Sequence, residues 1–391
     1  MRIVEVREQA VRLEAAIRNS LIDFSQMTVS VVAVITDRHR NGKPIVGLGF
    51  NSIGRYAESG LLRDRFIPRL LDAGDAVRGD DGELDPALVR DVLMRNEKPG
   101  GHGERSGAVA ALEIAVWDAV AKDADVPLYG LLADRCNGGE FDRHVEVYAA
   151  GGYYYPDDGP YRLVQEMRGY LDEGYTHLKI KIGGASLDDD MARLESVLEV
   201  VGGDGSRLAV DANGRFDLET AVAYAERMAP YGLRWYEEPG DPLDYALQAE
   251  LGRHYDPPFA TAENLFSHQD VRNLLRHAGL RPDVDLLQMD PGLSYGIVEL
   301  TRMLDVMHHE GWSPRRVIPH GGHLMALHMA AGLQLGGNES YPGIFQPFGG
   351  FGQQHEVIDG AIAIDDTPGI GLEHKAELLP ILAELVPEAY A

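Results

Sequence analysis

Short apolar runs that end in charged residues repeat through the middle of this chain, from Lys179 to His320. The runs are HLKIKIGG, RLAVDANG, LRWYEEPG, FATAENL, VDLLQMDPG and RRVIPHGGH. Three of the acidic ends, Asp211, Glu237 and Glu263, follow one another at intervals of 26 residues. A strand, a helix and two short loops take roughly 25–35 residues. The pattern therefore predicts a series of strand–helix units with parallel strands.

If these strands close into a barrel, their polar ends meet on one face. Catalytic residues of strand–helix barrels collect at the carboxyl ends of the strands. The repeating units begin near His144, and a further run that ends at Glu339 could close the barrel. We therefore expect the barrel to span residues 141–350 and to carry a site at the strand ends.

The flanking segments follow a different pattern. Residues 1–13, 27–37 and 45–50 are expected to be strands, with a turn at Asn41-Gly42, which is typical of an antiparallel sheet. Helical periodicity follows at 61–73, at 85–97 and in a buried helix at 107–126, whose polar edge includes Asp118. Residues 1–140 thus form an α+β domain. Residues 351–391 contain a hairpin with a turn at Asp359-Gly360, and we expect this tail to return to the first domain.

Composition limits the class of protein. A chain of 391 residues exceeds the usual limit of about 250–300 for one core. The net charge of −26 argues against nucleic acid or an anionic membrane as partner, because both need a basic surface. Cys136 is alone, and no apolar leader or membrane-length run is seen. We expect a cytoplasmic enzyme with a small-molecule substrate.

The three evenly spaced acids predict a metal site. Three carboxylates on neighbouring strand ends repel one another strongly unless a cation neutralises them. Carboxylate oxygens suit Mg²⁺ better than zinc or copper. Asp211, Glu237 and Glu263 are therefore predicted to bind Mg²⁺. The alternative is that each acid is a solvated loop or helix-cap residue.

Two further sets of residues could move protons. Lys179 and Lys181 lie two apart on a strand, so they point to the same face. Beside a metal the pKa of such a lysine falls, and it can act as a general base. Asp290 and His320 end later strands, and an aspartate that accepts a hydrogen bond from an imidazole orients the ring. The alternatives are structural ion pairs and a structural histidine.

Other sites are less well supported by the pattern. His320, His323 and His328 could be taken for a zinc site, but spacings of three and five residues do not place all three on one helical face. Neither GxGxxG nor GxxxxGK[ST] occurs, so nucleotide binding is disfavoured.

These motifs resemble those of the enolase superfamily, in its mandelate racemase-like branch. The matching pieces are KIK at 179–181, DANG at 211–214, EEP at 237–239, AEN at 262–264, Asp290 and PHGGH at 319–323. The resemblance covers the whole chain. It implies an α/β fold in which a modified TIM barrel, (β/α)₇β, lies under an α+β capping domain completed by the C-terminal tail.

The resemblance also implies a role for the residues at the strand ends. It implies Mg²⁺ on the three evenly spaced acids, Lys181 as one base, and the Asp290–His320 pair as the opposite acid/base group. Glu339 matches an acid that hydrogen-bonds the substrate carboxylate in its enolate form. The further candidate substrate contacts are Lys179, Asn213 and His323.

Longer runs are similar to the D-tartrate dehydratase group of this branch. They are IRNSLIDFSQMT, NEKPGGHGERS, YAAGGYYYP, ENLFSHQD, LSYG and GGNESYP. By this resemblance Lys98 and Asn51 become candidate substrate contacts; ordinary loop polarity is the alternative. The chain departs from that group beside its catalytic positions, at Pro239, Ala262 and Pro291-Gly292.

The resulting hypothesis is a Mg²⁺-dependent dehydratase of a small hydroxy-diacid, with D-tartrate converted to oxaloacetate. It would act by α-proton abstraction and β-hydroxide elimination. The alternatives are a dehydratase of another acid sugar (an aldarate or aldonate), a racemase or epimerase of a 2-hydroxy acid, and a metal-binding barrel without catalysis. We also expect a homo-oligomer.

Overall fold

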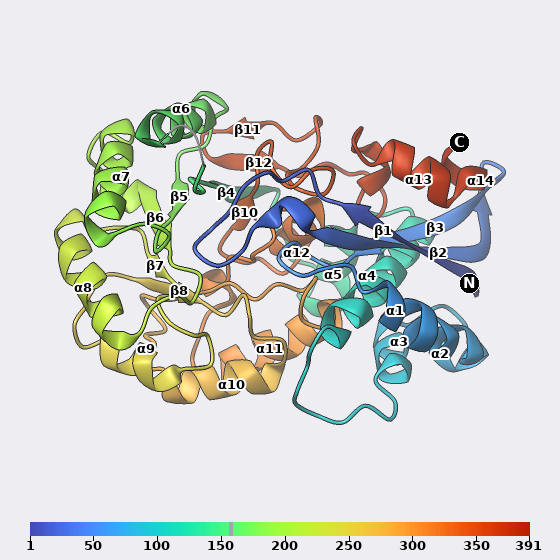
Figure 1. The fold of residues 1–391 in the computed structure, drawn as a ribbon. Helices are drawn as coiled ribbons and strands as arrows, with labels where there is room; N and C mark the ends of the chain where they lie inside the picture. The colour runs from blue at the N-terminus through green and yellow to red at the C-terminus, as the bar shows by residue number, and fades with distance from the viewer. Residues whose placement is uncertain (156–158) are drawn as a thin grey trace.

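A barrel of parallel strands and a smaller capping domain make up the structure (Figure 1). The computed structural model describes residues 1–155 and 159–391; Pro156, the last residue of the run YAAGGYYYP, lies outside them. The barrel lies on the left in Figure 1 with its helices around it, and the capping domain lies on the right with both chain termini.

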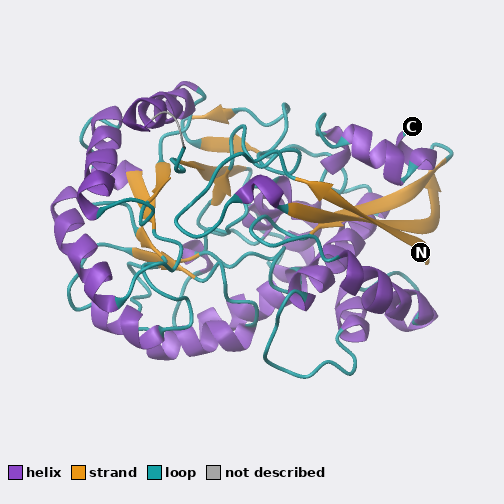
Figure 2. Ribbon diagram, in the orientation of Figure 1, coloured by secondary structure: helices purple, strands orange, loops and turns teal. Residues whose placement is uncertain are grey.

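The barrel strands and helices alternate along the chain. The strands are β4 (His144–Gly151), β5 (Leu178–Lys181), β6 (Leu208–Asp211), β7 (Tyr236–Glu237), β8 (Phe259–Thr261), β9 (Leu286–Leu287) and β10 (Asn338–Ser340). The helices between them are α6 (Gly159–Asp172), α7 (Leu187–Val200), α8 (Leu218–Met228), α9 (Tyr245–Leu251), α10 (His268–His277), α11 (Ile297–His309) and α12 (Leu324–Gly332). Figure 2 shows the helices outside the strands.

Hydrogen bonds close the barrel. β4 to β9 pair in chain order, and β10 pairs in parallel with β4. The gap between β9 and β10 is filled by residues 317–319: the Ile318 N–H donates to the Leu287 carbonyl (2.9 Å), and the Glu339 N–H donates to the Pro319 carbonyl (3.3 Å). Counting this short segment as a strand, the described residues give seven strand–helix units and a final strand. The predicted (β/α)₇β barrel is confirmed.

The capping domain is built on an antiparallel sheet of β1 (Ile3–Arg12), β2 (Thr28–Arg40) and β3 (Lys43–Phe50). Asn41 and Gly42 both have positive φ, 53° and 79°, as the predicted tight hairpin turn requires. The helices are α1 (Ser59–Leu61), α2 (Ile67–Asp72), α3 (Pro86–Leu93), α4 (Arg105–Asp123) and α5 (Leu128–Cys136). α4 is buried from Ser106 to Lys122 and packs on β2 and β3, as its apolar circumference predicts.

The C-terminal tail divides between the two parts. The predicted hairpin forms as β11 (Val357–Ile358) and β12 (Ala361–Ala363), but β12 pairs antiparallel with β4 and so extends the barrel sheet. From Gly369 onward the tail returns to the capping domain: the Leu128 N–H donates to the Gly369 carbonyl (2.8 Å), and the last helices, α13 (Leu379–Leu385) and α14 (Pro387–Tyr390), contact β1 and β3 (Figure 1).

Two local expectations needed correction. Asp118 does not lie at a polar edge: it is fully buried, accepts hydrogen bonds from the Leu48 and Ile370 N–H groups (2.8 and 2.6 Å) and pairs with Lys122 (2.8 Å). It therefore joins α4, β3 and the tail, and its pairing with Lys122 offsets the cost of burying its charge. The helix expected at 61–73 is interrupted by a π-turn at Leu62–Phe66, just before Pro68, which has no N–H to donate.

Among the described residues, no helix is long and apolar enough to cross a membrane.

Candidate active site with a metal-binding carboxylate triad

Strand register places the first site residues in one row. Lys181 at the end of β5 is the partner of Asp211 on β6, and Asp211 is the partner of Glu237 on β7. Neighbouring strands lie about 4.8 Å apart, so side chains that point inward from such a row come into contact. Glu263 follows β8 by two residues and joins the same end of the barrel.

Asp211, Glu237 and Glu263 form a carboxylate triad. Each offers one oxygen, and these oxygens lie within 4.8 Å of one another. Asp211 and Glu237 are fully buried, and burial together with the charge of Asp211 raises the pKa of Glu237 to about 8. A set of three crowded oxygen donors with excess negative charge fits a hard divalent cation, Mg²⁺ above all. The predicted triad is therefore present and suited to this ion.

Ala262 precedes the third acid in a strained conformation. Its φ is +91°, a region that favours glycine. Because this residue sets the direction in which the chain leaves β8, its backbone conformation helps to aim Glu263 into the site.

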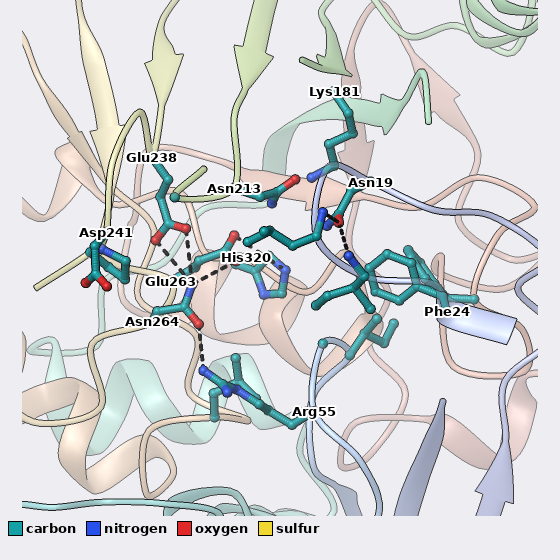
Figure 3. Close-up of a pocket in the computed structure, with 18 of the residues that line it drawn as sticks. Asn19, Phe24, Arg55, Lys181, Asn213, Glu238, Asp241, Glu263, Asn264 and His320 are labelled. Atoms are coloured by element: carbon teal, nitrogen blue, oxygen red, sulfur yellow. Dashed lines mark hydrogen bonds and ion pairs between the residues drawn. The ribbon is translucent and has the colours of Figure 1, made fainter. Parts of the chain in front are cut away.

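The two lysines of β5 have different surroundings. Lys179 is fully buried, and its Nζ lies 2.6 Å from Glu237 and 2.7 Å from Glu339. Burial alone would lower the pKa of Lys179, but these carboxylates outweigh burial and hold the pKa well above its usual value. Lys181 pairs with Asp211 and lines the cavity (Figure 3). Lys181 is thus the lysine that a substrate can reach.

His320 and Asp290 form the predicted pair. The Nδ1 atom of His320 lies 2.8 Å from Asp290 Oδ2, so Nδ1 carries a proton and Nε2 faces the cavity. Asp290 also accepts a hydrogen bond from the Gly292 N–H (2.7 Å). Burial alone lowers the pKa of His320, but the nearby Glu263 carboxylate and the bond to Asp290 raise it to about 10. With Nδ1 held by Asp290, Nε2 is the atom of His320 that can give or take a proton in the cavity.

Lys181, His320 and Glu263 line one cavity of about 480 Å³, at the interface of barrel and cap. The cap contributes Phe24 from the 3-10 turn at Phe24–Gln26, and it also contributes Arg55. Figure 3 shows Lys181 and Arg55 on different sides of His320. The cavity can therefore hold a small ligand between the strand ends and the cap.

The predicted substrate contacts fall into two groups. Asn213 lines the cavity and donates from its backbone N–H to Asp211 (2.8 Å). Lys179 and Glu339 lie beneath the cavity as an internal ion pair. Glu339 Oε2 accepts a hydrogen bond from the Gly321 N–H (3.0 Å), so this acid fixes the turn that carries His320.

Three other predicted contacts, Asn51, Lys98 and His323, lie outside the cavity lining. Asn51 is fully buried. Its side-chain oxygen accepts a hydrogen bond from the Ser30 N–H (2.7 Å), and its side-chain nitrogen donates one to the Tyr56 carbonyl (3.1 Å), so the amide is satisfied within the protein. Lys98 is exposed in the loop before α4, and its carbonyl accepts a hydrogen bond from Arg105 (2.7 Å). The prediction of substrate contacts at Asn51 and Lys98 is therefore corrected: Asn51 is part of the buried scaffold, and Lys98 lies on the surface.

His323 and His328 also serve the scaffold. His323 Nε2 lies 3.1 Å from Ser52 Oγ, and its Nδ1 caps α12 by accepting from the Ala326 N–H (3.2 Å). His328 Nδ1 accepts a hydrogen bond from the Tyr129 N–H, with 3.3 Å between the two nitrogens. The two rings therefore have separate partners, and among the described residues the groups able to hold a metal do not include them.

Sequence reasoning missed three polar residues of the site. Tyr341 OH lies 3.0 Å from His320 Nε2. Asn264 donates to Glu263 (3.2 Å) and to Glu238 (3.1 Å). Arg55 in turn donates to the Asn264 side-chain oxygen (2.8 Å). Tyr341 and Asn264 directly follow predicted site residues, in NESY and AEN, and this adjacency in the sequence could have indicated that they belong to the site. Arg55 lies in a loop without a motif, which carries no such indication.

A barrel with an acidic triad, a lysine and an Asp–His pair at its strand ends defines a class of metal-dependent barrel enzymes. Comparison with known proteins identifies the class. Residues 162–378 match the family described as "Enolase C-terminal domain-like", which is more than half of the chain. This chain belongs to the enolase superfamily, as its motifs indicated.

Named relatives narrow the range of activities to be considered. The chain is 30% identical over 306 residues to an arabinonate dehydratase from Saccharolobus solfataricus, covering 75% of this chain and 76% of the relative. It is 29% identical over 348 residues to an L-talarate/galactarate dehydratase from Salmonella typhimurium, covering 88% and 81%.

A solved structure agrees over nearly the whole chain. The L-talarate/galactarate dehydratase from Salmonella typhimurium LT2, liganded with Mg and L-lyxarohydroxamate, has a TM-score of 0.75 and 25% identity. The match covers 95% of this chain and 90% of that one. The capping domain and the barrel are therefore arranged as in a known acid-sugar dehydratase.

Proposed function

We propose that this protein dehydrates a small hydroxy-diacid, with D-tartrate as substrate and oxaloacetate as product. The observation that carries the proposal is the placement of Lys181 and His320 in one cavity beside the carboxylate triad. Relatives named as acid-sugar dehydratases support the reaction class. The longer runs NEKPGGHGERS and GGNESYP, similar to D-tartrate dehydratases, support the choice of substrate.

Asp211, Glu237 and Glu263 would hold the Mg²⁺. When bound, this ion supplies positive charge that stabilises the negative charge developing on the substrate carboxylate. Lys179 is the other cation beneath the site; it neutralises Glu237 and Glu339 and so keeps the triad's net charge from becoming prohibitive.

Lys181 and His320 divide the proton transfers. Lys181 Nζ takes the proton from C2 of the substrate, and the electron pair of that C–H bond forms the C2–C3 double bond. The C3–OH bond breaks, and His320 donates its Nε2 proton to the departing hydroxide, which leaves as water. The resulting enol becomes oxaloacetate by moving its hydroxyl proton to carbon. His320 suits the acid role because Asp290 holds its Nδ1 and leaves Nε2 directed to the cavity.

Two variants test the roles of these residues. Lys181→Ala and His320→Asn should each lower kcat for oxaloacetate formation from D-tartrate with Mg²⁺ by about 100- to 10,000-fold, the usual contribution of an acid or base. Full activity in either variant would overturn the role of that residue. No oxaloacetate from the wild-type protein would overturn D-tartrate as the substrate, and the same assay on longer aldarates and aldonates then examines the wider class.

The presence of two proton-transfer groups also supports a second candidate, a racemase or epimerase of a 2-hydroxy acid. Lys181 and His320 line the same cavity, and a proton removed by one could be replaced by the other. Incubation in D₂O distinguishes the reactions: deuterium at C2 without loss of water indicates racemisation. The predicted homo-oligomer and cytoplasmic location stay predictions.

A further inference from the structure

Arg55 lies at the cap side of the cavity, on a loop that is firmly held. The loop follows β3, and Ser30 on β2 anchors it twice: the Ser30 N–H donates to the Asn51 amide (2.7 Å), and Ser30 Oγ accepts from the Glu58 N–H (2.9 Å). Thr28 Oγ1 accepts from the Ala57 N–H (3.1 Å). The position of Arg55 is therefore set before any ligand binds, which lowers the entropy cost of using it as a contact.

The guanidinium group of Arg55 is only partly used within the protein. One nitrogen, Nη2, donates to the side-chain oxygen of Asn264 (2.8 Å), and the group lies over the ring of Phe266 at 5.3 Å from its centre. A guanidinium has five N–H donors. Among the described residues no other hydrogen bond of Arg55 is found, so the group can still present a pair of donors to the cavity that it lines.

The charge of a diacid requires such a group. The first carboxylate of the diacid lies beside the carbon that loses a proton, and the metal site would bind this carboxylate. The second carboxylate brings another negative charge into a chain of net charge −26. Of the cavity-lining residues that the structure describes, the basic ones are Lys181, His320 and Arg55, and the first two are taken by the proton transfers. Arg55 also lies on a different side of His320 from Lys181 (Figure 3).

We propose that Arg55 binds the second carboxylate of the substrate and so selects diacids over monoacids. This inference rests on the proposed dehydratase function and adds the residue that determines specificity. A planar guanidinium matches a carboxylate with two parallel hydrogen bonds, which a hydroxymethyl group at the same position cannot accept. Lys98, the cation expected from the sequence, is exposed and lies outside the cavity lining.

Arg55→Met tests the proposal on a matched pair of substrates. D-Threonate carries a hydroxymethyl group where D-tartrate carries its second carboxylate. The variant should lose about 10- to 100-fold in kcat/KM for D-tartrate, mostly through KM, and less than about 3-fold for D-threonate. Arg55→Lys, which keeps the charge and loses the planar fork, should fall in between. Arg63→Met, an exposed change in the same domain, should leave both values unchanged.

An equal loss on both substrates would overturn the proposal, since it would mean that Arg55 acts through Asn264 on the metal-binding carboxylates. Circular dichroism and the melting temperature check that each variant is folded.

Binding of unreactive acids keeps this test separate from the proposed reaction. Malate and 2,4-dihydroxybutyrate differ in the same way as the substrate pair, and with the C1 carboxylate at the metal site neither has a hydroxyl on C3 to lose. In calorimetry with Mg²⁺, the wild-type protein should bind malate about 10-fold or more tightly than 2,4-dihydroxybutyrate, and Arg55→Met should remove that preference. No preference in the wild type, or a preference that persists in Arg55→Met, would overturn the inference. If no acid is dehydrated, but the wild-type protein prefers malate and Arg55→Met does not, the proposed reaction is wrong and the role of Arg55 stands.

Discussion

At the scale of single residues, the site is organised by buried charge. Lys179 lies between three carboxylates, with Nζ 2.6 Å from Glu237, 2.7 Å from Glu339 and 3.8 Å from Asp211. All four side chains are fully buried or nearly so. A charge in such a place is tolerated only while its partners are present. The two lysines of KIK therefore differ: Lys179 is a buried counterion, whereas Lys181 lines the cavity and is the residue we propose as the base.

Lys179→Met should destabilise the protein by about 3–5 kcal/mol, because it leaves buried carboxylates without their counterion. Saturating Mg²⁺ should restore part of this loss by supplying positive charge to Glu237 and Asp211. Urea unfolding with and without Mg²⁺ measures both effects. Lys98→Met, on an exposed lysine, should change stability by no more than about 0.5 kcal/mol. A Lys179→Met protein as stable as the control would show that the ion pairs contribute nothing.

The adjacent acids Glu237 and Glu238 allow a matched test of the metal site. Glu237 belongs to the triad, whereas Glu238 has φ +37° and turns away to Asn264. Mg²⁺ at about 100 times its Kd should stabilise the wild-type protein by about 2.7 kcal/mol, and a chelator should remove this gain. Glu237→Gln should lose most of the gain, and Glu238→Gln should keep it. The reverse result, read from melting temperatures, would assign the metal to the other glutamate.

The residues with a fixed place in a repeating unit were predictable from sequence, because strand register fixes where they point. Asp211 and Glu237 were found by their spacing alone and are register partners in the structure. Arg55 was missed, and Asn51 and Lys98 were not placed correctly, because loops that cover a barrel have no such period. Their positions depend on hydrogen bonds such as that from Ser30 to Asn51, which no local pattern reveals.

At the scale of elements, the capping domain depends on close approach between β3 and α4. A side chain at Gly49 would place its Cβ 2.4 Å from the Ala111 carbonyl oxygen, and one at Gly47 would lie 1.9 Å from that of Ala115. These two glycines alternate along β3, so one face of the strand lies directly on the helix. The same strand leads into the loop that carries Arg55, so this packing also positions the cap side of the cavity.

Gly49→Ala should therefore destabilise the protein by about 1–3 kcal/mol through overpacking. It should also raise KM more than it lowers kcat, because the strand shift moves the cap loop but leaves the barrel groups in place. Gly60→Ala is the control: its Cβ would meet nothing within 4 Å, and α1 should gain slightly. Unfolding curves and steady-state kinetics measure the two effects, and an unchanged Gly49→Ala protein would contradict the close-packing argument.

Elements with strong periodicity were predicted well, and short ones less well. The hairpin at Asn41-Gly42 and the buried α4 agree with their patterns. β7 and β9 have only two residues each, far shorter than the apolar runs that predicted them, because hydrogen bonding to neighbouring strands decides where a strand ends. The pairing of the β11–β12 hairpin with β4 could not be predicted from sequence either, because the local pattern of a hairpin does not indicate which other strand it pairs with.

At the scale of the whole molecule, buried polar residues join the barrel to the parts around it. Asp118 connects α4 to β3 and to the tail at Ile370. His328, on barrel helix α12, accepts a hydrogen bond from the Tyr129 N–H of α5 through Nδ1 and donates from Nε2 to the Ile370 carbonyl (3.0 Å). Three segments that are far apart in sequence thus meet at one neutral imidazole.

The neutral state of His328 makes the assembled molecule sensitive to acid. Burial lowers the pKa of His328 to about 3, from the ordinary value of 6.5. Below pH 6.5 the unfolded chain takes up a proton at this residue that the folded protein refuses, so stability falls as the pH falls and stops falling only near pH 3. Between pH 7 and pH 5 this residue should lower the stability of the wild-type protein by about 2 kcal/mol.

His328→Gln, which has no ring to protonate, should start less stable at pH 7 because it disturbs two buried hydrogen bonds. It should then lose about 2 kcal/mol less than the wild type on going to pH 5. Urea unfolding at the two pH values measures the difference, and parallel losses in the two proteins would show that this junction does not titrate on unfolding.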